Sequence, residues 1–251
     1  MVDLEDLKLK AKNIRKSIVE MVYSAASGHP GGSLSITDVF TALYFKELNI
    51  DVNNPKDENR DRVVLSKGHC SPALYSSLAE KGFIPQEDLK TFRKTDSYLQ
   101  GHPDMKKIPG VDMTSGSLGQ GLSVANGMAL AGKMDNKEYR VYAILGDGEI
   151  QEGQVWEAAM TSSHYKLDNL CVIVDNNNLQ IDGNVDKVMS IYPIDEKFKS
   201  FGFEVINIDG HNILEIIEAS PFKKETISLV ICSSLETSTS LVQYPKHSCI
   251  W

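Results

Sequence analysis

Two apolar segments of this chain, residues 139–145 and 170–174, each lead directly into a loop that carries oxygen-bearing side chains. Both segments have the composition of buried strands and the residues between them have a helical pattern, so the three form a β-α-β unit. Asp147 follows the first strand, and Asn177 follows the second, 30 residues later. Because the carboxyl ends of parallel strands meet at one edge of a sheet, Asp147 and Asn177 can converge there on one ligand.

The donor types at this edge favour a divalent cation. A carboxylate from Asp147, an amide oxygen from Asn177 and the main-chain carbonyl of Leu179 are hard ligands that suit Mg²⁺ or Ca²⁺ bridging a diphosphate. Gly146 and Gly148 flank the aspartate and allow a ligand to approach the backbone closely. The alternative is an ordinary Asp-Gly turn beside an asparagine-rich loop. The second donor at the right place along the chain favours the binding site.

The same pairing of Gly-Asp-Gly with a later asparagine is found in the thiamine diphosphate-dependent enzymes, which this chain resembles. Within that superfamily it is similar to transketolase, because four further motifs occur in the order of that family. These motifs are Ser27-Gly28-His29-Pro30-Gly31-Gly32, Asp61-Arg62-Val63-Val64-Leu65-Ser66-Lys67-Gly68-His69, Gly101-His102-Pro103 and Gly116-Ser117-Leu118-Gly119-Gln120-Gly121.

The strand pattern and the resemblance together predict an α/β fold, in which helices cover both faces of a mostly parallel central sheet. We assign residues 1–219 to one diphosphate-binding domain and residues 220–251 to a divergent tail, with one strand followed by irregular chain. The family would continue in this tail with a Lys-Gly-rich segment and a further active-site histidine, and His247 does not match that role. A reading-frame change and genuine divergence would both account for such a tail.

Turn residues and periodicity predict the other elements. Ser35 and Asp38 have the spacing of a capping box at the start of a helix. Ser71 is expected to cap a helix with a proline in its first turn, and Pro85 to begin another helix. The long loop 94–117 is interpreted as a wall of the active site. The other predicted helices are 1–21, 119–132, 195–200 and 213–219, and the other strands are 62–65, 203–208 and 227–232.

The resemblance also implies roles for individual residues. His29 would assist proton transfer or bind the acceptor carbonyl, and His102 would hold a donor hydroxyl. Glu152 would couple to a glutamate of a partner subunit in the relay that activates the cofactor. The alternative is that the histidines stabilise loops and that Glu152 is an ordinary acid at a helix amino terminus. Lys67 would attract phosphate or simply be solvated. The expected cofactor contacts are His69, Gly116, Leu118, Gly146, Asp147, Gly148, Glu149, Asn177 and Ile181, and the expected metal ligands are Asp147, Asn177 and Leu179.

The activity implied by the resemblance is transfer of a two-carbon ketol unit from a ketose phosphate to an aldose phosphate, with thiamine diphosphate and Mg²⁺ (or Ca²⁺). The pyrimidine-binding domain of full-length relatives has no counterpart here, so we expect the amino-terminal subunit of a split enzyme. Its partner would be a complementary pyrimidine-domain subunit, in an assembly built on a homodimer of this chain or a heterotetramer. The alternatives are a catalytically inactive diphosphate-binding or dimerisation module and a subunit of the dihydroxyacetone synthase or deoxyxylulose phosphate synthase type.

Composition excludes other classes. A net charge of -8 and a pI near 5.3 disfavour a nucleic-acid-binding surface, which relies on clustered Lys and Arg. No apolar run is long enough to span a bilayer, so no membrane partner is expected. Cys70, Cys171, Cys232 and Cys249 are widely spaced and form no Cys-x-x-Cys pair, which indicates neither a zinc site nor a disulfide framework. The expected location is therefore the cytoplasm.

Overall fold

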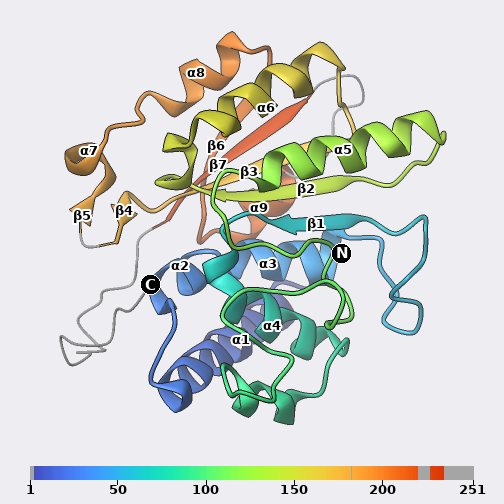
Figure 1. The fold of residues 1–251 in the computed structure, drawn as a ribbon, viewed down its shortest axis with the longest axis vertical. Coiled ribbons are helices and arrows are strands. Elements are labelled where there is room, and N and C mark those ends of the chain that lie inside the picture. The colour runs from blue at the N-terminus through green and yellow to red at the C-terminus, as the bar shows by residue number, and fades with distance from the viewer. Residues whose placement is uncertain (1–2, 182, 220–226, 235–251) are drawn as a thin grey trace.

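Five strands form the central sheet, in the order β1-β2-β3-β7-β6 (Figure 1). The computed structural model describes residues 3–181, 183–219 and 227–234. Every neighbouring pair in this sheet is parallel, which confirms the predicted α/β class. The strands are β1 (Arg62–Leu65), β2 (Val141–Gly146), β3 (Leu170–Asn176), β6 (Glu204–Asp209) and β7 (Ser228–Ser233).

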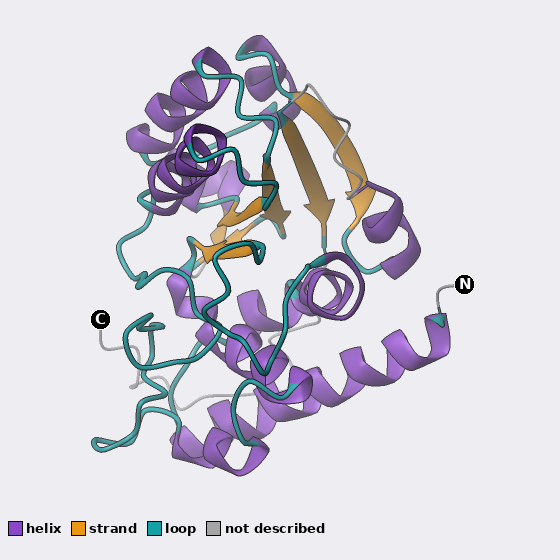
Figure 2. Ribbon diagram, turned by 90° about the vertical axis from the view of Figure 1, so that its right-hand side faces the viewer, coloured by secondary structure: helices purple, strands orange, loops and turns teal. Residues whose placement is uncertain are grey.

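Alternate residues of the strands pack into different cores, as expected for a sheet covered on both faces. In β2, Tyr142 and Ile144 belong to one core, whereas Ala143 and Leu145 belong to the other. Figure 1 and Figure 2 show the helical layers on the two sides of the sheet. The first face is covered by α1 (Leu4–Ala25), α3 (Thr37–Ala42), α4 (Ser71–Lys81) and α9 (Ile213–Ala219), and the second by α5 (Gly121–Met134), α6 (Gly153–His164) and α8 (Ile194–Ser200).

The amino-terminal helix α1 forms because its sequence combines a cap with an apolar stripe. The Asp3 side chain accepts a hydrogen bond from the Asp6 amide at 3.1 Å and satisfies one free donor of the first turn. Ile14 and Ile18 are completely buried against the sheet-side core. Full burial of one aliphatic side chain contributes about 1.5–3 kcal/mol, so this stripe fixes the helix on the first face.

Local capping was predicted wrongly at two places. Ser35 does not cap α3, because it is the last residue of the preceding helix α2 (Pro30–Ser35) and its hydroxyl donates to Asp175. Ser71 is the first residue of α4 rather than its cap, and its hydroxyl donates to the Gly101 carbonyl at 2.8 Å. In both cases the serine lies inside a helix rather than before one, and its hydroxyl donates to a partner distant in sequence.

Several short elements connect the layers. The helix predicted to begin at Pro85 and to reach about Arg93 is only a short 3-10 helix, η3 (Gln86–Thr91), and the chain from there to α5 is the predicted long loop. The other short elements are the π-helix η1 (Leu43–Glu47), the 3-10 helices η2 (Gly68–Cys70) and η4 (Glu149–Gln151), helix α7 (Val185–Val188), and the antiparallel hairpin of β4 (Leu179–Gln180) and β5 (Gly183–Asn184).

The strand predicted at 227–232 is β7, and it occupies an interior position between β3 and β6. Ser228 pairs with both Cys171 of β3 and Glu204 of β6. The irregular chain expected after this strand lies outside the described residues, as do 220–226 and His247. The division of the chain at residue 219 stays a prediction. Among the described helices, none has the length and apolar character needed to cross a membrane.

Candidate functional site

The loops that follow β2 and β3 meet at the carboxyl edge of the sheet. The strand register pairs Gly146 with Asp175, so the next residues of both strands are neighbours. The Asp147 carboxylate accepts the Asn178 amide at 2.5 Å and the Gly148 amide at 2.8 Å. The Asn177 side-chain oxygen accepts the amide of Leu179 at 2.9 Å. The structure therefore brings the two predicted ligand segments together.

The Asp147 carboxylate is poorly solvated, a cost that a bound cation would offset. Its side chain is buried, and this burial raises its pKa to about 6, although the amides of Gly148 and Asn178 act in the opposite direction. Within the described residues no group of three or more His, Cys, Asp or Glu side chains could hold a metal ion. The predicted site has one carboxylate, so its other ligands would be the Asn177 and Leu179 oxygens and those of a diphosphate. Hard oxygen donors around a desolvated carboxylate fit Mg²⁺ or Ca²⁺.

A pair of glutamine side chains joins the same two loops. Gln151 donates to Gln180 at 2.8 Å, and Gln180 donates back to Gln151 at 3.0 Å. The Gln151 amide also donates to the Met189 carbonyl at 2.9 Å. This pair fixes the β4–β5 hairpin, and with it the segment around Leu179, to the loop that follows Asp147. Sequence reasoning missed it, because neither glutamine belongs to a recognisable motif.

The three predicted histidines come from three separate loops and lie near one another. His29 is the N-cap residue of α2, His69 lies in η2, and His102 lies in the long loop. The rings of His29 and His69 have centroids 5.0 Å apart in an edge-to-face arrangement. A Cβ on Gly116 would stand 3.5 Å from the His102 ring, so the glycine loop packs against this histidine. His29 and His102 keep solvent-exposed surface, although the surrounding protein desolvates part of each side chain.

The surroundings lower the pKa of all three histidines, so the neutral ring is favoured at pH 7. Burial, together with the positive charge of Lys67, lowers the pKa of His69 to about 4. The pKa of His29 is lowered by burial and by the neighbouring His69, Arg93 and His102. Neutral imidazole has one donor and one acceptor nitrogen, so it can exchange a proton with a hydroxyl group.

Glu149 connects three loops of the site through hydrogen bonds. Its side chain is buried and accepts hydrogen bonds from the Ser66 hydroxyl, from the Gly119 amide at 2.9 Å and from the Gly146 amide at 3.0 Å. A Cβ on Gly121 would lie 2.3 Å from the Ser66 hydroxyl, so α5 starts in direct contact with the loop after β1. All of these donors belong to the protein. The Glu149 carboxylate therefore holds the loops together in this structure. A direct contact with the cofactor stays a prediction.

Glu152 and the two exposed apolar residues lie at the rim. Glu152 is the N-cap residue of α6 but makes no side-chain cap, and its side chain packs against Gly119. Ile181 is 83% exposed and has a backbone φ of +51°, while Leu118 is 36% exposed. Both apolar side chains are uncovered, and the predicted contact of each with the cofactor stays a prediction.

Lys67 and Asp175 form a buried ion pair that the sequence did not predict. The Lys67 ammonium donates to the Asp175 carboxylate and to the Gly32 carbonyl at 3.0 Å, and Asp175 also accepts the hydroxyls of Ser35 and Ser234. Burial alone would lower the pKa of Lys67, but the facing Asp175 charge raises it. The sequence held two separate signals for this pair. One is an aspartate at the end of an apolar strand, and the other is a Ser-Lys-Gly-His motif that follows a different strand. Of the two interpretations of Lys67, a phosphate contact or a solvated residue, its burial excludes the second.

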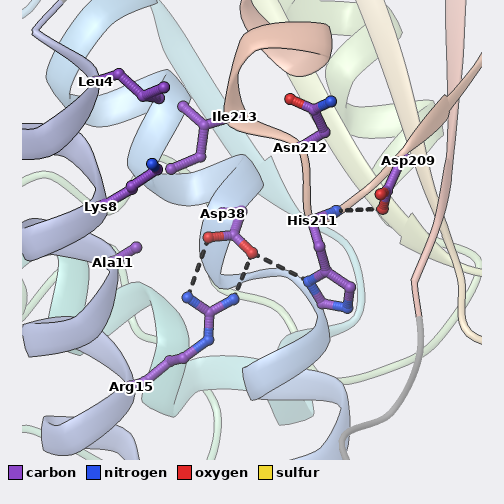
Figure 3. Close-up of a pocket in the computed structure, with 9 residues that line it drawn as sticks. All are labelled: Leu4, Lys8, Ala11, Arg15, Asp38, Asp209, His211, Asn212 and Ile213. Atoms are coloured by element: carbon purple, nitrogen blue, oxygen red, sulfur yellow. Dashed lines mark hydrogen bonds and ion pairs between the residues drawn. The ribbon is translucent and has the colours of Figure 1, made fainter.

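A separate cavity of about 380 Å³ lies between the amino end of α1 and the loop after β6 (Figure 3). Asp38 accepts from Arg15 at 3.0 Å and contacts the ring of His211 at 3.0 Å. Burial would raise the pKa of Asp38, but hydrogen bonds from His211 and Arg15 lower it. None of the site residues predicted from the sequence lines this cavity, so it is distinct from the site at the carboxyl edge.

Residues 7–246 match the family model described as transketolase, thiamine diphosphate binding domain. The match continues past residue 219 into the segment predicted to diverge. The chain is 49% identical over 214 residues to the 6-deoxy-6-sulfo-D-fructose transketolase subunit SqwG of Clostridium sp. (strain MSTE9), covering 85% of this chain and 78% of the relative. It is 45% identical over 216 residues to a subunit of the apulose-4-phosphate transketolase of Phocaeicola vulgatus, covering 86% and 76% respectively.

The fold agrees with this similarity. The crystal structure of transketolase from Campylobacter jejuni superposes with a TM-score of 0.87 at 35% identity, covering 93% of this chain but 38% of that one. The alignment thus spans little more than a third of the larger protein. The chain belongs to the transketolase family and contains its thiamine diphosphate-binding domain.

Proposed function

We propose that this chain is the diphosphate-binding subunit of a split transketolase, which transfers a two-carbon ketol unit from a ketose phosphate to an aldose phosphate. The observation that carries the proposal is the convergence of the Asp147 and Asn177 segments with His29, His69 and His102 at one edge of the sheet. The lengths of the relatives support the split. Two relatives of similar length are named as subunits, whereas the transketolase chain from Campylobacter jejuni is covered over only 38%.

In this proposal, Asp147, Asn177 and the Leu179 carbonyl would hold Mg²⁺ or Ca²⁺, which would supply positive charge for binding a diphosphate. His69, the Gly146–Glu149 loop, Gly116, Leu118 and Ile181 contact the cofactor. Thiamine diphosphate, when bound, supplies the electron sink that ketol transfer needs. Residues of this chain bind and orient the cofactor, and a pyrimidine-domain partner supplies the other half of the site.

The histidines serve as proton carriers and as hydrogen-bond partners of the sugars. His102 holds a hydroxyl of the donor, and His29 moves a proton on the acceptor or binds its carbonyl. Both residues keep exposed surface and have lowered pKa values that favour the neutral ring near pH 7, which suits general acid-base chemistry. Glu152 couples to a glutamate of the partner subunit in this proposal, and the exposure of its side chain supports that role.

The names of the two subunit relatives guide the choice of sugar class. The two subunit relatives are named for different substrates, a sulfofructose and apulose 4-phosphate. We therefore assign the class, a ketose that carries an anionic group, rather than one sugar. A dihydroxyacetone synthase or deoxyxylulose phosphate synthase type of reaction is the alternative within the superfamily. A cytoplasmic location is part of the proposal, and the buried free thiols of Cys70, Cys171 and Cys232 are compatible with it.

The experiment is ketol transfer from xylulose 5-phosphate to ribose 5-phosphate, with thiamine diphosphate and Mg²⁺, for the chain alone and with a candidate pyrimidine-domain subunit. Activity that appears only when both subunits are present supports a split transketolase. Assembly and cofactor binding without turnover of any ketose phosphate would favour the inactive module instead.

Two variants test the metal site within the same experiment. Asp147→Ala should abolish Mg²⁺-dependent cofactor binding in the assembled protein, and Asn177→Ala should weaken it. His164→Gln, on the exposed surface of α6, is the matched control and should leave binding unchanged. Unaltered Mg²⁺-dependent affinity in Asp147→Ala would show that the assigned ligands are wrong.

A further inference from the structure

The guanidinium of Arg93 lies between two loops that each lead to a histidine. Its Nη1 donates to the Ser27 hydroxyl at 3.1 Å, two residues before His29. On another side it packs against Gly101, the residue before His102. A Cβ at Gly101 would stand 2.7 Å from Arg93 Nη2, so only glycine leaves room for the guanidinium there. One side chain therefore contacts both loops.

The backbone around Arg93 holds this side chain in place. Arg93 has a φ of +61°, a left-handed conformation that costs a non-glycine residue roughly 1 kcal/mol. Its amide donates to the Leu99 carbonyl at 2.8 Å, and its guanidinium carbon lies 5.5 Å from the ring centroid of the buried Phe92. The surrounding structure thus enforces an unfavourable backbone conformation, and that conformation directs the arginine toward the histidine loops.

Among the described residues, no carboxylate neutralises the charge of Arg93. Its Nε is buried and has no hydrogen-bond partner in this part of the chain. No Asp or Glu that the structure describes forms an ion pair with its guanidinium. An unpaired guanidinium beside imidazoles disfavours their protonated form, because like charges repel.

The charge of Arg93 lowers the pKa of both neighbouring histidines, His29 and His102. The pKa of His29 is lowered by burial first and then by the charges of His69, Arg93 and His102. The pKa of His102 is lowered by burial, by His69 and by Arg93. The charged groups that act on His69 are different, namely Lys67, Glu149 and Asp175. Arg93 is therefore the fixed cation common to His29 and His102.

We propose that Arg93 is a positioning residue that sets the His29 and His102 loops relative to each other and keeps both imidazoles neutral. A neutral imidazole can accept a proton from a sugar hydroxyl, which an imidazolium cannot. The use of these imidazoles in ketol transfer rests on the proposed function. Their protonation state is a property of this chain and can be measured without cofactor, sugar or partner.

The test is an NMR titration of the histidine ring protons in the full chain, with the signals assigned from His29→Gln and His102→Gln. Arg93→Met removes the charge and keeps much of the side-chain length, whereas Arg93→Lys keeps the charge. We expect the midpoints of His29 and His102 to move upward in Arg93→Met and to move less in Arg93→Lys. A purely structural role would shift them equally in both variants.

Gly101→Ala provides a second route to the same result. The added methyl group meets only the far end of a flexible side chain, so the chain should fold with the guanidinium displaced. The His29 and His102 midpoints should again rise. Arg62→Met, at the start of β1, is the control for loss of an arginine and should leave both midpoints unchanged. Unmoved midpoints in Arg93→Met and Gly101→Ala, or equal shifts in the lysine and methionine variants, would overturn the proposal.

Discussion

Gln151 and Gln180 exchange two hydrogen bonds, at 2.8 Å and 3.0 Å, although they lie 29 residues apart and belong to the segments that follow β2 and β3. Each amide uses both its oxygen and its nitrogen in this pairing. The pair connects η4, which follows Asp147, to β4, which contains Leu179. It therefore restrains two of the three assigned ligands relative to each other.

Loss of this amide pair should weaken cofactor binding. Gln151→Ala is expected to lower Mg²⁺-dependent thiamine diphosphate affinity about five- to tenfold in the assembled protein, which corresponds to about 1–1.4 kcal/mol for lost hydrogen bonds. Titration calorimetry measures this change. The matched control is Gln154→Ala, which breaks the 2.6 Å amide contact between Gln154 of α6 and Gln120, the N-cap residue of α5. An equal loss of affinity in the control would contradict a specific role of the Gln151–Gln180 pair.

The Lys67–Asp175 pair is expected to matter most when only one partner is removed. Both side chains are almost fully buried, so Lys67→Met leaves the Asp175 carboxylate without its counter-charge. The expected destabilisation is about 3–5 kcal/mol in urea unfolding. Lys199→Met removes the ammonium from an exposed i,i+4 pair with Asp195 and should cost less than about 1 kcal/mol. Similar losses in the two variants would show that Lys67 is not a buried structural charge.

Two glycines of α5 should respond in opposite ways to alanine. A Cβ at Gly121 would stand 2.3 Å from the Ser66 hydroxyl and 2.7 Å from its Cα, so Gly121→Ala must displace backbone and should destabilise by more than about 1 kcal/mol. A Cβ at Gly127 meets no atom within 4 Å. Gly127→Ala should therefore stabilise the helix by about 0.5–1 kcal/mol. Thermal unfolding compares the two, and a stabilising Gly121→Ala would disprove the close contact between α5 and the loop after β1.

Burial of neutral His69 predicts acid sensitivity. The unfolded chain binds this proton near the ordinary value of 6.5, whereas the folded chain binds it near 4, so the free energy of unfolding should fall as the pH is lowered between these values. This shift contributes up to about 2 kcal/mol to the free energy of unfolding. The value is set below that of the full shift because His69 is only partly buried. His69→Gln should flatten this pH dependence in chemical unfolding, while His164→Gln should retain it. An unchanged slope in His69→Gln would exclude this residue as the source.

Much of the site was predictable, because the residues that define its chemistry lie in short sequence segments. Asp147 and Asn177 each follow an apolar strand, and parallel strands place their carboxyl ends at one edge. Their convergence therefore follows from strand pattern alone. The same reasoning predicted that β7 exists, but not that it lies between β3 and β6. Strand order depends on which apolar faces pack against which helices, and a single strand does not encode it.

The residues that sequence reasoning missed are those whose partners are far away in the chain. Ser35 has the spacing of a helix cap, yet its hydroxyl reaches Asp175, 140 residues later. Lys67 has the sequence context of a surface or phosphate-binding lysine, but the fold encloses it with that same carboxylate. Arg93 belongs to no motif, and only the approach of the Ser27 and Gly101 loops gives it a place in the site.

The sequence alone determined the α/β class, the family and the identity of the ligand-bearing loops, because these depend on strand periodicity and on side-chain chemistry within short segments. The tertiary structure decided which polar groups are buried together, which histidines share the Arg93 charge, and which apolar residues such as Ile181 remain uncovered. Burial, charge and hydrogen-bond partnership are properties of pairs brought together by folding. For that reason, the packing of the whole chain, rather than any local segment, sets the electrostatics of the site.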